Sequence, residues 1–235
     1  HIFGVPVKLT EVTSIMDMVE IRQLKKYFKV GPEEVKALDG IDLSIEKGKF
    51  TAIVGASGSG KTTLLNTIAG LYEPTEGTVI VDGLDLSKMT EEQLTVFRRR
   101  KIGFVFQGYN LIPELTIREN ILFPLALDDS RPDTRYFSSL VKMLGLENHL
   151  DAFPHMLSGG AQQCTAIARA LITKPSIVLA DEPTGSFDMK TTQNVAGLLK
   201  MTAATFHQTL VVITHNLELA QLADRVVRLR DGKIL

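Results

Sequence analysis

A glycine-rich stretch constrains the fold of this chain more than any other feature of its sequence. Residues 55–62 read Gly-Ala-Ser-Gly-Ser-Gly-Lys-Thr and fit the pattern G-x-x-x-x-G-K-[ST] in full. The β-rich run 50–54 precedes the pattern, and residues 61–69 follow it with helical periodicity. This layout is typical of a strand that turns into a helix around a phosphate group, since glycines let the N–H groups of the turn converge on phosphate oxygens. The alternative is a Gly/Ser-rich turn that binds nothing.

The side chains of this loop predict how it would hold a nucleotide. Lys61 can reach the β- and γ-phosphates as a point charge, and Thr62 offers a hydroxyl to Mg²⁺. The residues expected to bind the nucleotide here are Gly55, Ala56, Ser57, Gly58, Ser59, Gly60, Lys61, Thr62 and Thr63.

Short hydrophobic runs alternate with helical patterns along most of the chain, which is typical of an α/β fold with a largely parallel sheet. Strands are expected over residues 18–24, 41–45, 50–54, 78–81, 102–106, 177–180, 210–214 and 226–229. Helices are expected over residues 61–69, 90–99, 117–125, 132–144, 161–174, 191–203 and 217–223. The mostly helical segment 108–174 is expected to form an inserted lobe.

Composition excludes several classes of protein. The 235 residues are 44% hydrophobic and 23% charged, which is ordinary for a globular chain, and a net charge of −1 gives no positive field for nucleic acid. The single cysteine, Cys164, excludes an internal disulfide framework and a Cys-rich zinc site. No stretch is long and apolar enough to cross a bilayer, so we expect another chain to supply any membrane-spanning part. Residues 1–17 are expected to be an N-terminal extension to a domain over residues 18–235.

Two carboxylates end the apolar run 177–180. Asp181 and Glu182 are sequence neighbours at a predicted strand end, so their side chains point in different directions. One of them can hold Mg²⁺ while the other orients and deprotonates a water near the γ-phosphate. The alternative is a solvated strand end without a function.

A second candidate anion site begins another helix. Ser158 can cap this helix, and the glycines at 159 and 160 allow a ligand to approach closely. One nucleotide does not easily need both sites from one chain if they lie on separate lobes. A two-fold dimer would bring residues 55–62 of one chain to residues 158–160 of the other. The alternative is an ordinary capped helix.

The order and spacing of these motifs resemble the nucleotide-binding domain of ABC transporters, from Met18 to Leu235. The segments 105–107, 110–113, 115–116 and 119–121 are most similar to the branch of macrolide exporters and lipoprotein-releasing complexes. The resemblance implies a P-loop NTPase fold with a mainly parallel core sheet, an antiparallel β subdomain and an inserted helical subdomain. It rests on the residue set 55–62, Gln107, 157–160, 181–184, Asp188 and His215.

The resemblance also implies roles for individual residues, with ATP and Mg²⁺ as cofactors. Phe28 matches the aromatic residue of an early loop that stacks on adenine, with Tyr27 as the alternative, although Phe28 could equally be a core residue. Asp188 matches a residue of a loop that crosses the dimer interface, and it is expected to contribute to nucleotide binding. Ser158, Gly159 and Gly160 are also expected to bind the nucleotide. The implied catalytic residues are Lys61, Gln107, Glu182 and His215, and the implied metal ligands are Thr62, Gln107 and Asp181.

The function implied is that of an ATP-hydrolysing motor subunit at the cytoplasmic face of the cell membrane. Such a subunit forms an ATP-dependent homodimer, acts on a separate transmembrane permease subunit and binds no nucleic acid. Tyr109, Leu111 and Ile112 are expected to be exposed and to line the groove that receives the permease. A switch acting in DNA repair or at the ribosome is disfavoured by the lack of coiled-coil or zinc insertions, and a kinase or GTPase does not explain residues 157–160 or His215.

Two positions depart from the pattern of the family. Ala161 and Cys164 stand where it usually has Gln and Arg, which removes an amide and a cation from the helix after Ser158. We expect ATP binding across the dimer to be weaker as a result. The alternative function is therefore an ATP-binding regulatory module with weakened or lost turnover.

Overall fold

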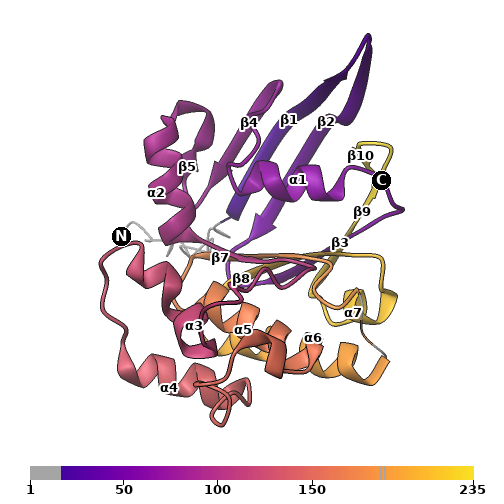
Figure 1. The fold of residues 1–235 in the computed structure, drawn as a ribbon. Coiled ribbons are helices and arrows are strands. Elements are labelled where there is room, and N and C mark those ends of the chain that lie inside the picture. The colour runs from indigo at the N-terminus through magenta and orange to yellow at the C-terminus, as the bar shows by residue number, and fades with distance from the viewer. Residues whose placement is uncertain (1–16, 186, 188) are drawn as a thin grey trace, which may run out of the picture.

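The computed structural model describes residues 17–185, 187 and 189–235. Within these residues a core sheet has the strand order β10-β9-β3-β8-β7-β6 (Figure 1). Neighbours from β9 to β6 are parallel, and β10 is antiparallel to β9. The strands are β3 (Phe50–Val54), β6 (Ile102–Val105), β7 (Ile177–Asp181), β8 (Thr209–Thr214), β9 (Arg225–Arg230) and β10 (Lys233–Ile234).

A second, antiparallel sheet has the order β2-β1-β4-β5 and lies above the core sheet in Figure 1. It consists of β1 (Asp17–Val30), β2 (Glu33–Glu46), β4 (Glu76–Val81) and β5 (Leu84–Asp85). The two short strands expected over residues 18–24 and 41–45 are wrong in extent, because they form one long hairpin. Its outer half, residues 25–40, is mostly polar and buries Leu38 alone, so its strand structure comes from cross-strand pairing that hydrophobic periodicity does not reveal.

Helices cover both faces of the core sheet. Helix α1 lies between the two sheets, and α3 to α6 lie on the opposite face of the core sheet (Figure 1). The helix expected over 161–174 is wrong at both ends, because the cap at Ser158 brings both glycines into the first turn and the helix ends at Leu171. The helices are α1 (Lys61–Ile68), α2 (Glu91–Lys101), α3 (Ile117–Ala126), α4 (Thr134–Met143), α5 (Gly159–Leu171), α6 (Met189–Thr205) and α7 (Leu217–Gln221), with short 3₁₀ turns at Leu86–Lys88 and Pro154–Met156.

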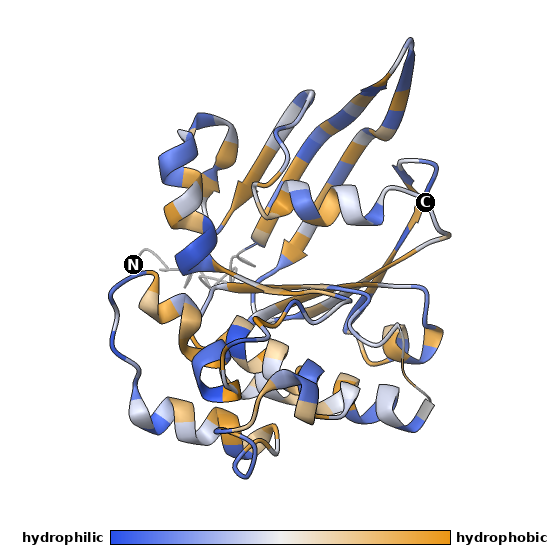
Figure 2. Cartoon of the chain, viewed as in Figure 1, coloured by the Kyte–Doolittle hydropathy of each residue, from blue (hydrophilic) through white to orange (hydrophobic). Residues whose placement is uncertain are grey.

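The core sheet separates two hydrophobic clusters. Along β7, Ile177 and Leu179 pack with the antiparallel sheet and α1, whereas Val178 and Ala180 pack with the helices below. Figure 2 shows hydrophobic residues along these strands. Because both faces are buried, the strand must be continuously apolar, which is why its sequence shows no alternation. The α/β fold with a parallel core, an antiparallel sheet and a helical layer is confirmed.

Helix starts follow the sequence signals. Reciprocal side-chain to backbone hydrogen bonds join Thr90 with Gln93 at α2 and Thr116 with Glu119 at α3. Ser158 accepts a hydrogen bond from the Ala161 N–H at 3.3 Å, which confirms it as the cap of α5.

The basic run 98–101 forms the end of α2, and its arginines have partners in other segments. Arg99 and Arg100 form ion pairs with Asp128 at 2.9 and 3.0 Å, and Arg98 donates to a backbone carbonyl at 2.8 Å. The run therefore ties α2 to neighbouring segments, since opposite charges far apart in sequence meet at its end.

Asp82 joins the two sheets electrostatically. Its carboxylate accepts hydrogen bonds from Lys101 and Ser176, both at 2.9 Å, and lies 3.4 Å from Lys47. The Lys101 bond, with smaller contributions from Ser176 and Lys47, lowers the pKa of Asp82 below its usual value although partial burial opposes this. A lowered pKa means that the stabilisation is present above the ordinary aspartate pKa and is lost as pH falls through the folded-state value.

We expect Asp82→Asn to lower the free energy of unfolding by about 1 to 2 kcal/mol at pH 7, because both lysines are about half exposed and screened by water. The difference from the unmodified chain should shrink below about pH 4. Urea unfolding of the variant and of the unmodified chain, at pH 7 and at pH 3.5, measures the difference in unfolding free energy at each pH. Asp129→Asn is a matched control, since Asp129 is exposed and has the same left-handed backbone as Asp82; an equal effect of both substitutions would contradict this role of Asp82.

Candidate functional site

The glycine-rich loop joins β3 to α1 and is shaped by glycines and by Lys61. Gly60 precedes the helix with φ +101°, and a Cβ there would lie 2.4 Å from the carbonyl oxygen of Ala37. The buried Lys61 donates from Nζ to the carbonyl oxygens of Gly55 and Ala56, both at 2.9 Å. The loop therefore encloses a positive charge at the N-terminus of α1, which suits phosphate oxygens.

Asp181 and Glu182 point to different partners, as predicted. Burial raises the pKa of the Asp181 carboxyl, and its hydrogen bond with Thr62 and the charge of Lys61 oppose that rise. Glu182 has a left-handed backbone with φ +44°, and its carboxylate lies 2.9 Å from Nδ1 of His215 and accepts from the His215 N–H at 3.3 Å. The Glu182 side chain is 14% exposed and that of His215 68% exposed, so the histidine lies at the mouth of the site.

One cavity of about 880 Å³ brings most of the predicted residues together. The sequence did not single out the β2 segment 35–37 or the turn at Asp231–Gly232, which also line it. The turn is tied to the loop, because the Gly232 N–H donates to the Ser59 carbonyl at 3.1 Å and the Gly232 carbonyl accepts from the Asp39 N–H at 2.9 Å. The predicted residues in its lining are Ser57, Gly58, Gly60, Lys61, Thr62, Thr63, Gln107, Asp181, Glu182 and His215.

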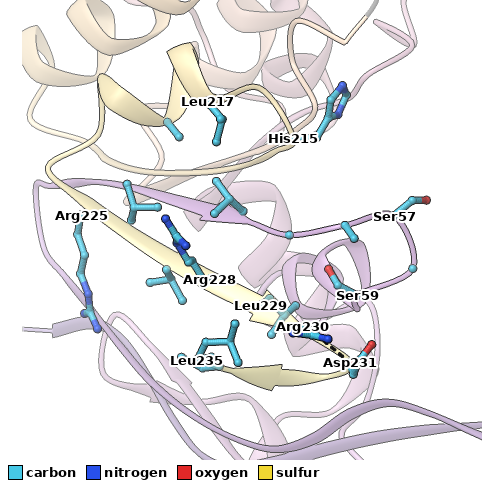
Figure 3. Close-up of a pocket in the computed structure, with 18 of the residues that line it drawn as sticks. Ser57, Ser59, His215, Leu217, Arg225, Arg228, Leu229, Arg230, Asp231 and Leu235 are labelled. Atoms are coloured by element: carbon cyan, nitrogen blue, oxygen red, sulfur yellow. Dashed lines mark ion pairs between the residues drawn. The ribbon is translucent and has the colours of Figure 1, made fainter.

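A second cavity, of about 1110 Å³, adjoins the first and shares lining residues with it, among them Ser57 and His215 (Figure 3). Gly55, Ala56 and Ser59 line it together with the β9 arginines, and Arg230 pairs with Asp231 at 3.5 Å. Lys61 and the two carboxylates line the first cavity instead, so the chemistry expected of them belongs there.

Phe28 lies in β1 rather than in a loop, which corrects that expectation. It pairs across the hairpin with Val35, its ring lies edge-on to Tyr72 with centroids 5.6 Å apart, and the Lys26 ammonium is 5.2 Å from the ring. The alternative, Tyr27, donates from its hydroxyl to Asp39 at 2.5 Å. The described lining of the 880 Å³ cavity includes Val35 but neither aromatic ring, so stacking on adenine stays a prediction.

Ser158, Gly159 and Gly160 lie at the start of α5, outside the described lining of the 880 Å³ cavity. A Cβ on Gly159 would lie 2.8 Å from the Tyr109 hydroxyl and 3.2 Å from the Phe187 ring. The two rings lie nearly parallel, with centroids 6.2 Å apart. A side chain at position 159 would therefore displace the Tyr109 hydroxyl from the start of α5. Asp188 lies outside the described residues.

The residues present fit Mg²⁺. Thr62 and Asp181 are joined by a hydrogen bond, and Gln107 lies beside the same cavity, so hydroxyl, carboxylate and amide oxygens converge. Mg²⁺ prefers such oxygen ligands and takes its others from phosphates and water. Among the residues that the structure describes, no group of three or more His, Cys, Asp or Glu side chains could hold a metal ion by itself.

Comparison with known proteins decides the family. The family model described as ABC transporter matches residues 38–185, which include the loop, Gln107, Ser158–Gly160 and both carboxylates. The chain belongs to the ABC transporter family. Within that family it is 42% identical over 221 residues to the macrolide export ATP-binding/permease protein MacB of Rhodopirellula baltica, covering 92% of this chain and 32% of that protein.

Other ABC transporter relatives match over nearly their whole length. An uncharacterized ABC transporter ATP-binding protein of Methanocaldococcus jannaschii is 42% identical over 224 residues, covering 92% of this chain and 95% of the relative. The ATP-binding cassette MJ0796, solved as a dimer in a post-hydrolysis state bound to ADP and Pi, has a TM-score of 0.83 and 41% identity, covering 92% of this chain and 96% of that one.

This ABC transporter chain spans about a third of the length of the macrolide-export relatives. In the part of it that the structure describes, every helix is too short or too polar to span a membrane.

Proposed function

We propose that this chain is the ATP-hydrolysing motor subunit of a transporter, which closes as a homodimer around Mg²⁺ and ATP and drives a separate permease. The observation that carries this proposal is the cavity that unites Lys61 and Thr62 with Asp181, Glu182 and His215. Phosphoryl transfer to water needs positioning and charge neutralisation, and these side chains supply both.

Each side chain has a defined task in this proposal. Lys61 would exchange its carbonyl partners for phosphate oxygens. Thr62, Asp181 and Gln107 would hold Mg²⁺, which when bound would neutralise phosphate charge. Glu182 orients a water and accepts its proton, because its carboxylate is fixed by the backbone and ring of His215. His215 is exposed enough to reach the γ-phosphate as well.

The position of Ser158–Gly160 supports a two-chain site. These residues start a helix whose N–H groups suit an anion, yet they do not line the described 880 Å³ cavity of their own chain. A second copy related by a two-fold axis would supply them. The dimeric state named for the similar cassette MJ0796 supports the same arrangement.

A groove of about 510 Å³ supports a permease partner and a place at the cytoplasmic face of the membrane. It lies between α2, β6, α3 and α5, and Phe104, Pro124 and Leu127 give it an apolar floor. The name of the relative MacB, an ATP-binding/permease protein, combines an ATP-binding part with a permease part, which supports a permease partner for this chain. The expectation that Tyr109, Leu111 and Ile112 are exposed is wrong, because all three are half-buried. Arg169 of α5 donates to the Tyr109 carbonyl, and the Ile112 N–H donates to Asn120 of α3.

One observation favours the alternative, a regulatory module with weakened turnover. Gln163 is fully buried, and within the described part of the chain neither of its amide atoms has a hydrogen-bond partner. Its neighbour Cys164 is buried in the core, where burial raises the pKa of the thiol to about 11. The family's Arg at position 164 is thus replaced by an inert packing residue, next to an unsatisfied amide.

The test is the rate of ATP hydrolysis with Mg²⁺ as a function of protein concentration, with Glu182→Gln as the blank. If two chains build each site, the rate should rise faster than linearly and vanish in the blank. A strictly linear rise would contradict the dimeric site. A rate equal to the blank would contradict the motor function of the chain by itself.

Restoring the family's residues separates the motor from the regulatory module. If Ala161 and Cys164 weaken turnover, the double variant Ala161→Gln, Cys164→Arg should raise the hydrolysis rate several-fold above that of the unmodified chain. An unchanged rate would contradict the alternative.

A further inference from the structure

A strained turn follows Gln107. Tyr109 and Asn110 both have left-handed backbones, with φ +58° and +50°. Non-glycine residues rarely adopt this conformation, and two in succession require an external constraint. The Asn110 N–H donates to the Gly108 carbonyl at 2.6 Å, which closes the turn one residue beyond Gln107.

Arg169 of α5 supplies the constraint. Its Nη2 donates to the Tyr109 carbonyl at 2.7 Å, and its Nη1 donates to the Asn110 carbonyl at 2.5 Å. Two consecutive left-handed residues turn their carbonyls in one direction, which matches the planar fork of a guanidinium. Arg169 is half-buried, and this burial lowers the pKa of its guanidinium.

The far end of the same loop is fixed independently. Asn120 of α3 is fully buried and accepts from the Ile112 N–H at 2.8 Å, while its amide donates to the carbonyls of Ile112, Leu115 and Thr116. Among the residues that the structure describes, the side-chain hydrogen bonds to the end nearest to Gln107 come from Arg169.

Arg169 also lines the 510 Å³ groove, beside Arg98 and Phe104. The Tyr109 ring, fixed through its backbone, lies over Gly159 at the start of α5 and against Phe187. One side chain thus contacts the groove, the turn after Gln107 and, through Tyr109, the helix start proposed to bind nucleotide across the dimer.

We propose that Arg169 is a positioning residue that holds Gln107 in its catalytic place through the strained turn at Tyr109–Asn110. This inference rests on the proposed ATPase function. It requires that loss of Arg169 slows turnover while the loop that binds the nucleotide is left intact.

The kinetic test compares Arg169→Gln with Arg169→Lys. Arg169→Gln should lower kcat at least about 10-fold through loss of two charge-assisted hydrogen bonds, with KM for ATP changed less than about twofold. Arg169→Lys keeps the charge but not the planar guanidinium that makes both hydrogen bonds. Its kcat should therefore lie between that of Arg169→Gln and that of the unmodified chain. Arg98→Gln is the matched control, because Arg98 lines the same groove and donates to a carbonyl at 2.8 Å, but to that of Gly70; its kcat should be unchanged.

A second readout does not depend on turnover. A nitroxide on Gly108→Cys reports the mobility of the turn, and the buried Cys164, whose thiol pKa is raised to about 11, does not compete for the label. Arg169→Gln should sharpen the electron paramagnetic resonance spectrum of this label, and Arg98→Gln should not.

The outcomes distinguish this inference from the function on which it rests. An immobile label in Arg169→Gln, or an equal loss of kcat in Arg98→Gln, overturns the role of Arg169. A fall of kcat accompanied by an equal loss of ATP affinity overturns it too, since general misfolding would cause both. If the unmodified chain has no turnover above Glu182→Gln, the proposed function fails, and the label still decides whether Arg169 holds the turn.

Discussion

Replacing Glu182 with Gln is expected to lower the turnover of ATP by a factor of about 10³, within the range for loss of a general base. The amide keeps the size of the side chain and can still meet His215, so the backbone at φ +44° and the cavity should stay intact. It cannot take a proton from water. Affinity for ATP should therefore change little, and single-turnover kinetics with a separate equilibrium titration would measure the two effects.

The same variant tests the dimer. If hydrolysis reopens a closed homodimer, Glu182→Gln should accumulate as a dimer when ATP and Mg²⁺ are present, and sedimentation would detect the doubled mass. His215→Gln is the companion variant, because it removes the ring that lies 2.9 Å from the carboxylate but keeps the backbone N–H bond. Its turnover should fall less than that of Glu182→Gln. A monomeric Glu182→Gln protein with normal turnover would contradict the assignment of Glu182.

Gly60→Ala is expected to have a large effect on the stability of the fold around the glycine-rich loop. The added Cβ would meet the Ala37 carbonyl oxygen at 2.4 Å, and φ +101° lies outside the left-handed region that L-residues tolerate. Because the Ala37 carbonyl belongs to the backbone of β2, it cannot move aside as a side chain could. We expect the free energy of unfolding to fall by about 3 to 5 kcal/mol, from overpacking together with backbone strain.

Gly58→Ala is the matched control for this prediction. Gly58 also has positive φ, +77°, but a Cβ there meets nothing within 4 Å among the described residues. Its substitution should cost only about 1 to 2 kcal/mol of backbone strain. Urea unfolding of both variants, with an ATP titration of whichever folds, gives the comparison. Equal losses in the two variants would show that the contact with Ala37 is unimportant.

The parts of the site that lie next to secondary-structure boundaries could be predicted from the sequence. The loop before Lys61, the carboxylates after β7 and the cap at Ser158 depend on local chain geometry, which residue type and spacing encode directly. The divergence of Asp181 and Glu182 also follows from strand geometry alone.

Contacts between distant segments could not be predicted in the same way. The pairing of the two strands across the outer half of the β1–β2 hairpin is not visible in the local sequence, and Phe28 lies in this hairpin rather than in the loop that the resemblance to the family implies. The pairing of Arg99 and Arg100 with Asp128 and the hold of Arg169 on residues 109 and 110 depend on which helices lie side by side. The sequence alone suggests that such charged residues are exposed to solvent, because their partners lie far away along the chain.

The hydrogen bond between Ser59 and Gly232 means that the contacts of the glycine-rich loop are completed late in the synthesis of the chain. Residue 232 is made last of the three segments joined at Asp39, Ser59 and Gly232, and β3 pairs with β8 and β9, which are also made late. During synthesis the glycine loop therefore lacks its bond to Gly232 for more than 170 residues after Ser59. Because these long-range contacts form late, the loop reaches the arrangement described above only after the segment up to Gly232 has been made.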